Sequence, residues 1–104
     1  MNRNEDIIKL LDEKKAENVE LINIKGSEYF VDEVVIATMI STKQSFAIIE
    51  DIKELLKKHN SKVYYEECTD DWSVLDLGDC LIHLMSSAYR DRYQIEKFLL
   101  EFKR

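Results

Sequence analysis

Apolar residues recur at the spacing of an amphipathic helix in three parts of the chain. The first part follows Asn4, which is expected to cap a helix that has acidic residues in its opening turn. The second follows Ser41, which forms a capping-box sequence with Gln44 three residues later. The third begins at Ser86 or Ser87 and has an apolar stripe toward the C-terminus. The predicted helices lie near residues 5–17, 42–59 and 87–102.

Five shorter segments have the apolar patterns of β-strands. Residues 19–24 alternate between apolar and polar side chains, which is typical of a strand with one buried face. Residues 34–37 are continuously apolar, which predicts a strand covered on both faces. A Leu-Gly-Asp break centred on Gly78 separates two further apolar runs and predicts a hairpin. The predicted strands are residues 19–24, 30–38, 62–66, 72–77 and 80–85.

The order of these elements is helix, two strands, helix, three strands and helix, which predicts an α/β fold. Strands separated by helices favour parallel pairing, and the hairpin at Gly78 adds antiparallel pairing. We therefore expect a five-stranded mixed sheet with three helices. The chain has 104 residues, no proline and two glycines, and it contains no linker or repeat, so residues 1–104 are predicted to form a single domain.

The charge of the chain narrows the classes of partner. Its 21 acidic and 15 basic residues give a net charge of −6, which argues against a broad phosphate-binding surface and direct nucleic-acid recognition. The same charge permits a basic protein partner, because opposite fields speed encounter. No apolar run approaches the length of a membrane span, and the N-terminus lacks the apolar core of a signal peptide. A cytoplasmic location without membrane contact is therefore expected.

Two blocks of sequence together resemble the ribosomal silencing factor family, also called the Iojap family. Residues 72–83 have the pattern W-x-x-x-D-x-G-D-x-x-x-H, and residues 90–96 continue it with R-x-x-Y-x-[LI]-E. Upstream, residues 32–44 resemble the block D-y-f-V-I-A-T-G-x-S-x-x-Q of that family. The blocks keep the family's order and approximate spacing, and the resemblance covers roughly residues 5–100.

The resemblance implies a fold, a partner and a mechanism. The implied fold resembles the nucleotidyltransferase fold without its catalytic site. The implied partner is the large ribosomal subunit, reached through the fourteenth large-subunit ribosomal protein beside the intersubunit face. Occupying that face would block joining of the small subunit and lower translation when nutrients are scarce. The mechanism is steric and needs no cofactor, and a homodimer off the ribosome is a further expectation.

Trp72 is the first candidate for the partner-binding surface. The residues alone fit two roles equally, an interface anchor and a cover for one end of the core. The resemblance favours the interface, because the family uses the corresponding surface for docking. Asp76 and Asp79 are expected either to meet basic side chains of the partner or to hold the hairpin in shape. Lys43, near the capped start of the second helix, is a weaker candidate.

Enzymatic activity is not expected, and no catalytic or metal-binding residue is assigned. Gly26 and Ser27 resemble a phosphate-holding turn, but no helix follows them directly and no D-x-D motif lies at a useful distance. No nucleophile is recognisably paired with His83, which is expected to be a hydrogen-bonded structural residue. Cys68 and Cys80 form no C-x-x-C pair and are expected to be reduced thiols. Two alternatives remain, a small metal-dependent nucleotidyl or phosphoryl transferase and an adaptor for another basic protein.

The chain departs from the family pattern at several positions. Met39 stands where the family usually has glycine, Arg92 replaces a usual aromatic residue, and Leu99 replaces a usual tryptophan. The pair Glu67-Cys68 stands where an acidic residue followed by glycine is common. These differences leave the expected fold in place and indicate a divergent member with its own contact list.

Overall fold

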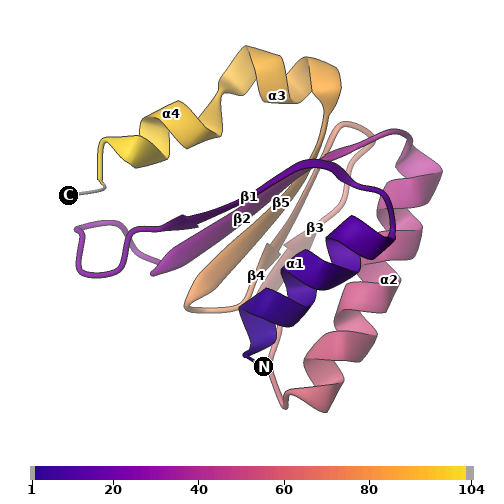
Figure 1. Cartoon of the computed structure of the whole chain (residues 1–104), viewed down its shortest axis with the longest axis horizontal. Coiled ribbons are helices and arrows are strands. Elements are labelled where there is room, and N and C mark those ends of the chain that lie inside the picture. The colour runs from indigo at the N-terminus through magenta and orange to yellow at the C-terminus, as the bar shows by residue number, and fades with distance from the viewer. Residues whose placement is uncertain (1, 103–104) are drawn as a thin grey trace.

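The computed structural model describes residues 2–102 as one layered α/β arrangement (Figure 1). The helices are α1 (Arg3–Glu13), α2 (Thr42–Lys58), α3 (Ser87–Tyr93) and α4 (Ile95–Leu100). The strands are β1 (Glu17–Asn23), β2 (Glu33–Met39), β3 (Tyr65–Glu67), β4 (Trp72–Asp76) and β5 (Cys80–Ser86).

All five strands join one mixed sheet in the order β1-β2-β5-β4-β3. β2 and β5 pair in parallel at its centre, and the other three pairings are antiparallel. Residues 34–37 of β2 are fully buried, as their continuous apolar run predicts. The expected α/β class with a five-stranded mixed sheet is therefore confirmed.

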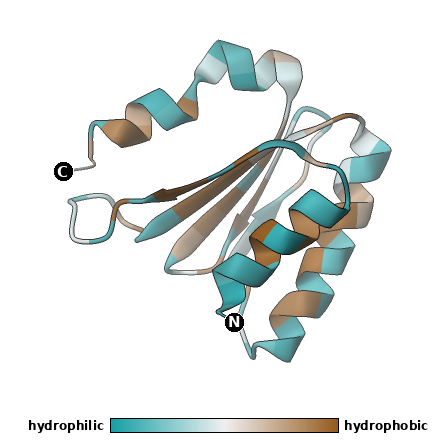
Figure 2. Ribbon diagram, in the orientation of Figure 1, coloured by the Kyte–Doolittle hydropathy of each residue, from teal (hydrophilic) through white to brown (hydrophobic). Residues whose placement is uncertain are grey.

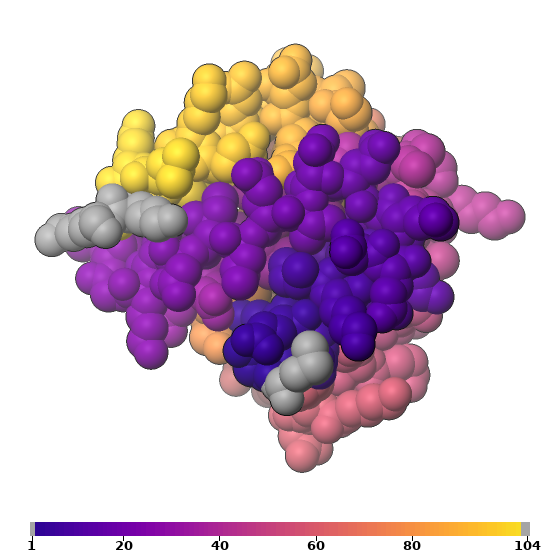
Figure 3. All heavy atoms as spheres, viewed as in Figure 1, coloured from indigo at the N-terminus to yellow at the C-terminus, as the bar shows by residue number. Residues whose placement is uncertain are grey.

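Helices cover both faces of the sheet. α1 and α2 pack on one face, where the buried apolar residues of α1 and α2 meet those of β2, β4 and β5. α3 and α4 lie on the opposite face, where Leu99 packs against side chains of β1, β2 and β5. The ribbons show apolar strands between helices that carry their apolar residues as stripes (Figure 2). In the space-filling view α3 and α4 adjoin β1 and the loop after it (Figure 3).

The N-terminal helix starts earlier than the sequence predicts. Its cap is Asn2, whose side-chain oxygen accepts a hydrogen bond from the backbone N–H of Glu5 at 2.8 Å. Asn4, the predicted cap, is a buried helical residue whose amide donates to Glu33 at 2.7 Å. The tertiary contact with β2 therefore takes Asn4 out of the capping role. α1 also ends at Glu13, because Lys15 adopts a positive φ of 66° before β1.

The C-terminal helix predicted over residues 87–102 is interrupted. Gln94 adopts the left-handed conformation, with φ 43° and ψ 53°, and separates α3 from α4. The bend lets α3 direct Arg90 toward β1 and β2 while α4 places Leu99 on the sheet with no exposed surface. Ile95, Leu99 and Phe102 pack toward the sheet as the apolar stripe predicts, whereas Phe98 is exposed. The break is a property of the packed chain.

Arg90 is a buried cation that connects α3 to the sheet. Its guanidinium donates hydrogen bonds to the backbone oxygen of Asn18 and, at 3.0 Å, to the hydroxyl of Thr38. It also pairs with the carboxylate of Glu20 and lies 3.9 Å from that of Glu96. Because β1 is irregular between residues 17 and 20, the backbone oxygen of Asn18 is available to this side chain.

His83 is the second buried polar side chain that bears on stability. It lies on β5 and is 8% exposed. Burial without a compensating negative charge lowers its pKa from 6.5 to about 4. The imidazole is therefore neutral in the folded protein at physiological pH.

Replacement of Arg90 by methionine is expected to lower the free energy of unfolding by about 2 kcal/mol, because the backbone oxygen of Asn18 and the buried hydroxyl of Thr38 lose their hydrogen-bond partner. Urea denaturation measures the change. Arg92→Met is the matched control: Arg92 is exposed on the same helix, so its loss should cost roughly 0.5 kcal/mol or less. Equal effects of the two substitutions would contradict the structural role assigned to Arg90.

His83 predicts a pH dependence of stability with a definite sign. Between about pH 6.5 and pH 4 the unfolded chain binds a proton at His83 that the native state does not, so the free energy of unfolding falls as the pH falls. The loss attributable to His83 should reach roughly 3 kcal/mol by pH 4. Urea titrations of the parent and His83→Asn isolate this contribution, since asparagine does not titrate. Parallel pH profiles for the two proteins would show that His83 is not buried in the neutral form.

Candidate partner-binding surface

The helical layer formed by α3 and α4 leaves part of the sheet uncovered. Along β4 the residues alternate between buried and half-buried, and Trp72, Val74 and Asp76 form the half-buried set. On the neighbouring edge strand β3, Tyr65 pairs with Asp76 and Glu67 pairs with Val74, and both β3 residues are exposed. These five residues form a continuous surface on β3 and β4, which we call the open sheet surface. It carries large apolar groups together with carboxylates.

Trp72 lies at one end of the open sheet surface and is held by several contacts. Its indole N–H donates a hydrogen bond to Nδ1 of His83 on the adjacent strand β5, at 3.0 Å. Its ring lies beside that of Tyr93 on α3, with 5.2 Å between the ring centroids. Its backbone N–H donates to the hydroxyl of Thr69, and this hydroxyl donates to its backbone oxygen. Trp72 is therefore fixed in place and half-buried.

His83 acts as a hydrogen-bond acceptor in this arrangement. Because Nδ1 accepts the indole proton, the neutral imidazole carries its own proton on Nε2. The low pKa of about 4 is consistent with this role, since a protonated ring would have no acceptor nitrogen. The expectation of a structural, hydrogen-bonded histidine is confirmed. Its partner was not identified from the sequence.

Asp76 has a structural contact within the hairpin turn. One carboxylate oxygen accepts a hydrogen bond from the backbone N–H of Gly78 at 2.8 Å. Gly78 adopts φ +92°, and a Cβ there would lie only 2.9 Å from the ring of Tyr64. Both observations explain why the turn uses an aspartate and a glycine. Asp76 still shares the open sheet surface with Trp72, about 13 Å away at ~3.3 Å per strand residue.

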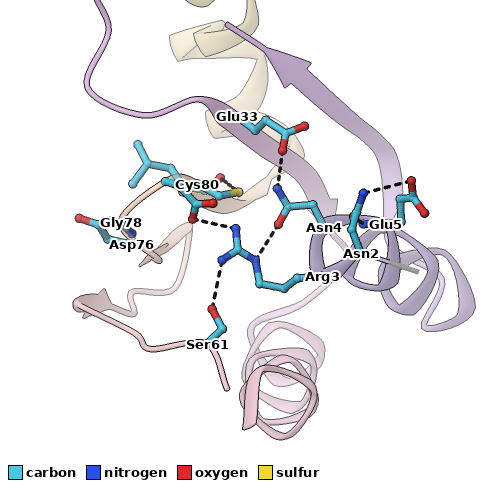
Figure 4. A network of polar contacts seen from close by, with 11 residues as sticks. Asn2, Arg3, Asn4, Glu5, Glu33, Ser61, Asp76, Gly78 and Cys80 are labelled. Carbon is cyan, nitrogen blue, oxygen red and sulfur yellow. Dashed lines mark hydrogen bonds and ion pairs between the residues drawn. The ribbon is translucent and has the colours of Figure 1, made fainter. Parts of the chain in front are cut away.

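Asp79 is directed toward the other layer of the molecule. Its carboxylate forms a 2.8 Å ion pair with Arg3 of α1, which packs on the opposite face of the sheet. Arg3 also donates hydrogen bonds to Ser61 and to the side chain of Asn4 (Figure 4). The structure therefore separates Asp79 from Trp72, although both belong to the same hairpin.

Lys43 lies in the first turn of α2 and is exposed. Its neighbour Thr42 donates a hydrogen bond to the backbone oxygen of Asp70, two residues before Trp72. Lys43 is thus near the Trp72 end of β4 but on the helix that covers the opposite face. Of the four residues named from the sequence, the structure places Trp72 and Asp76 on the open sheet surface.

Several members of this region were not singled out by the sequence. Tyr93 is 46% exposed beside Trp72, and Tyr65 is 55% exposed on β3. As amphipathic residues, the tyrosines are expected from the sequence to occupy half-buried core positions in most cases. The alternation in residues 72–76 was the available signal, because it places every second side chain on one face.

The described residues offer little support for catalytic chemistry. Residues 2–102 contain no group of three or more His, Cys, Asp or Glu side chains placed to hold a metal ion. Burial raises the pKa of both thiols, to about 12 for Cys80, so neither is an activated nucleophile. An open hollow of about 610 Å³ beside Arg90 is lined mainly by polar side chains.

Within residues 2–102, no helix is both long and apolar enough to cross a membrane.

Comparison with known proteins identifies the family. Residues 2–103 match the family model RsfS, described as ribosomal silencing factor during starvation. A ribosomal silencing factor of Haemophilus influenzae is 30% identical over 95 residues, which cover 89% of this chain and 93% of that protein. That of Bacillus subtilis is 31% identical over 88 residues, covering 83% and 75% respectively.

A solved structure shows the same fold. A crystal structure of a Chromobacterium violaceum protein superposes with a TM-score of 0.85 at 23% identity, and the match covers 92% of this chain and 82% of that one. The family model matches nearly the whole sequence, and the chain therefore belongs to the ribosomal silencing factor family.

Proposed function

We propose that this protein binds the large ribosomal subunit and represses translation by blocking the joining of the small subunit. Membership in the ribosomal silencing factor family assigns it to translation regulation and to the ribosome. The finer proposal is that it docks on the fourteenth large-subunit ribosomal protein, beside the intersubunit face. A bound domain at that face excludes the small subunit by its volume alone.

The open sheet surface is the observation that carries the proposal. It presents Trp72 and Tyr65 on rigid strands, and aromatic residues held in this way are typical anchors of protein interfaces. The carboxylates of Glu67 and Asp76 lie on the same surface, and the whole chain carries a charge of −6. An apolar centre with acidic neighbours fits a basic ribosomal protein.

The proposed mechanism requires no bond to be made or broken. The family is named for a regulator, and the two aspartates of the hairpin are engaged in a turn and an ion pair. We therefore propose a binding protein without cofactor and without direct nucleic-acid recognition. The proposal includes a cytoplasmic location, and a homodimer off the ribosome, because an exposed apolar surface favours self-association.

Trp72→Ala is the direct test of the docking surface. Loss of an aromatic anchor residue commonly costs about 2 kcal/mol or more, so affinity for isolated large subunits should fall roughly thirtyfold. Co-sedimentation with purified large subunits measures binding, and light scattering follows subunit joining. Circular dichroism verifies that the variant is folded.

Phe46→Ala is the matched control for this test. Phe46 is 45% exposed on α2, the helix that covers the other face of the sheet, so its removal should leave binding near the parent level. If Trp72→Ala stays folded, binds and blocks joining like the parent, the open sheet surface is not the docking surface. If the parent itself fails to bind large subunits, the proposed function is wrong.

Asp79→Asn tests whether Asp79, which lies outside the open sheet surface, contacts the partner. Asp79 forms an ion pair with Arg3, so removing its charge should break this pair. The free energy of unfolding should fall by about 1 kcal/mol or less. Arg3→Gln should have a similar effect. The double variant should be no less stable than the less stable of the two single variants. Urea denaturation and large-subunit binding are measured for all three proteins. A large loss of binding in Asp79→Asn that Arg3→Gln does not reproduce would indicate direct contact with the partner.

A further inference from the structure

Trp72 is half-buried, and its position is fixed by contacts from three other parts of the chain. Three separate segments fix it: Thr69 binds its backbone, His83 on β5 accepts its indole proton, and Tyr93 on α3 stacks beside its ring. A half-buried indole needs a partner for its N–H, and here that partner is a buried side chain fixed on the neighbouring strand. Restraints of this kind give a side chain one orientation before a partner arrives.

His83 is the restraint that acts on the indole itself. It is eleven residues from Trp72 in sequence and is brought beneath it by the antiparallel pairing of β4 with β5. Its Nδ1 lies 3.0 Å from the indole nitrogen, and the two rings are 5.8 Å apart between centroids. The imidazole is itself buried at 8% exposure, so its own orientation is fixed by packing.

We propose that His83 is a positioning residue, which holds the indole of Trp72 in the orientation that docks on the partner. The inference rests on the proposed function, because it assumes that Trp72 contacts the large subunit. His83 contributes by fixing the tryptophan and not by touching the partner. Its hydrogen bond removes in advance the conformational freedom that Trp72 would otherwise lose on binding.

The structure gives a reason why this position needs a neutral histidine. The atom that accepts the indole proton must lie close to the backbone of β5. Nδ1 of a histidine side chain meets this condition, and it belongs to a rigid ring. The residues paired with His83 across the sheet are Ile36 and Val74, and the ring of Trp72 lies beside it, so no charged group is among these neighbours. Burial keeps the pKa low, so the acceptor remains available at physiological pH.

The experiment compares three variants of the full chain. His83→Leu keeps a buried apolar side chain but removes the acceptor, whereas His83→Asn keeps an acceptor oxygen near the position of Nδ1. His59→Leu is the matched control, because the other histidine of the chain pairs with Asp6 on the opposite layer. Trp72 is the only tryptophan, so its indole N–H gives a single proton resonance in the NMR spectrum.

The expected result is a graded loss of order and of affinity. In His83→Leu the indole resonance should shift toward the solvent-exposed value and broaden, and affinity for large subunits should fall about three- to tenfold. His83→Asn should recover part of this loss. His59→Leu should leave the indole resonance where it is in the parent.

A double-variant cycle separates positioning from a general packing effect. Trp72→Phe keeps an aromatic ring but has no N–H to donate. In this variant His83 can no longer orient the ring at position 72 through a hydrogen bond. In that background His83→Leu should change affinity by less than about twofold. An equal loss of affinity in both backgrounds would overturn the inference, because His83 would then act independently of the indole.

The readouts also distinguish this inference from the proposed function. An unchanged indole resonance in His83→Leu overturns the positioning role and leaves the docking surface standing. A displaced indole with parent-like affinity overturns it as well, since orientation would then not matter for binding. Parent-like binding by Trp72→Ala instead refutes the docking surface itself.

Discussion

The parallel pairing of β2 with β5 is the contact on which the rest of the molecule depends. Seven residues of each strand pair in register, from Glu33 with Cys80 to Met39 with Ser86. Because these two strands form the centre of the sheet and are buried on both faces, each face needs its own helical layer. The connections that leave the two strands supply these layers, with α2 after β2 and α3 after β5 (Figure 1).

The two layers are unequal, and the candidate docking surface follows from that difference. α2 has 17 residues and packs beside α1, whereas α3 and α4 have seven and six residues with a break between them. The shorter layer covers β1, β2 and β5 but leaves one face of β4 and β3 half-buried or exposed. A protein that acts by occupying space needs a rigid contact surface, and an uncovered part of a sheet provides one.

Much of the architecture could be predicted from local patterns. The continuous apolar run of β2 predicts its central position, because only a strand covered on both faces tolerates such a run. The Leu-Gly-Asp break predicts the hairpin, since Gly78 adopts the positive φ that other residues rarely take. These features depend on neighbours in sequence, so the sequence by itself determined them.

Other features depend on side chains that are distant in sequence, and only the tertiary structure decided them. Asn4 does not cap the first helix, because its side chain binds Glu33. Asp79 pairs with Arg3 and therefore lies apart from Trp72. The left-handed residue at Gln94 interrupts a helix whose periodicity is unbroken. His83 meets the indole only because β4 pairs with β5 in one register. Such contacts form when the packed chain brings complementary polar groups together, and local periodicity carries no information about which groups will meet.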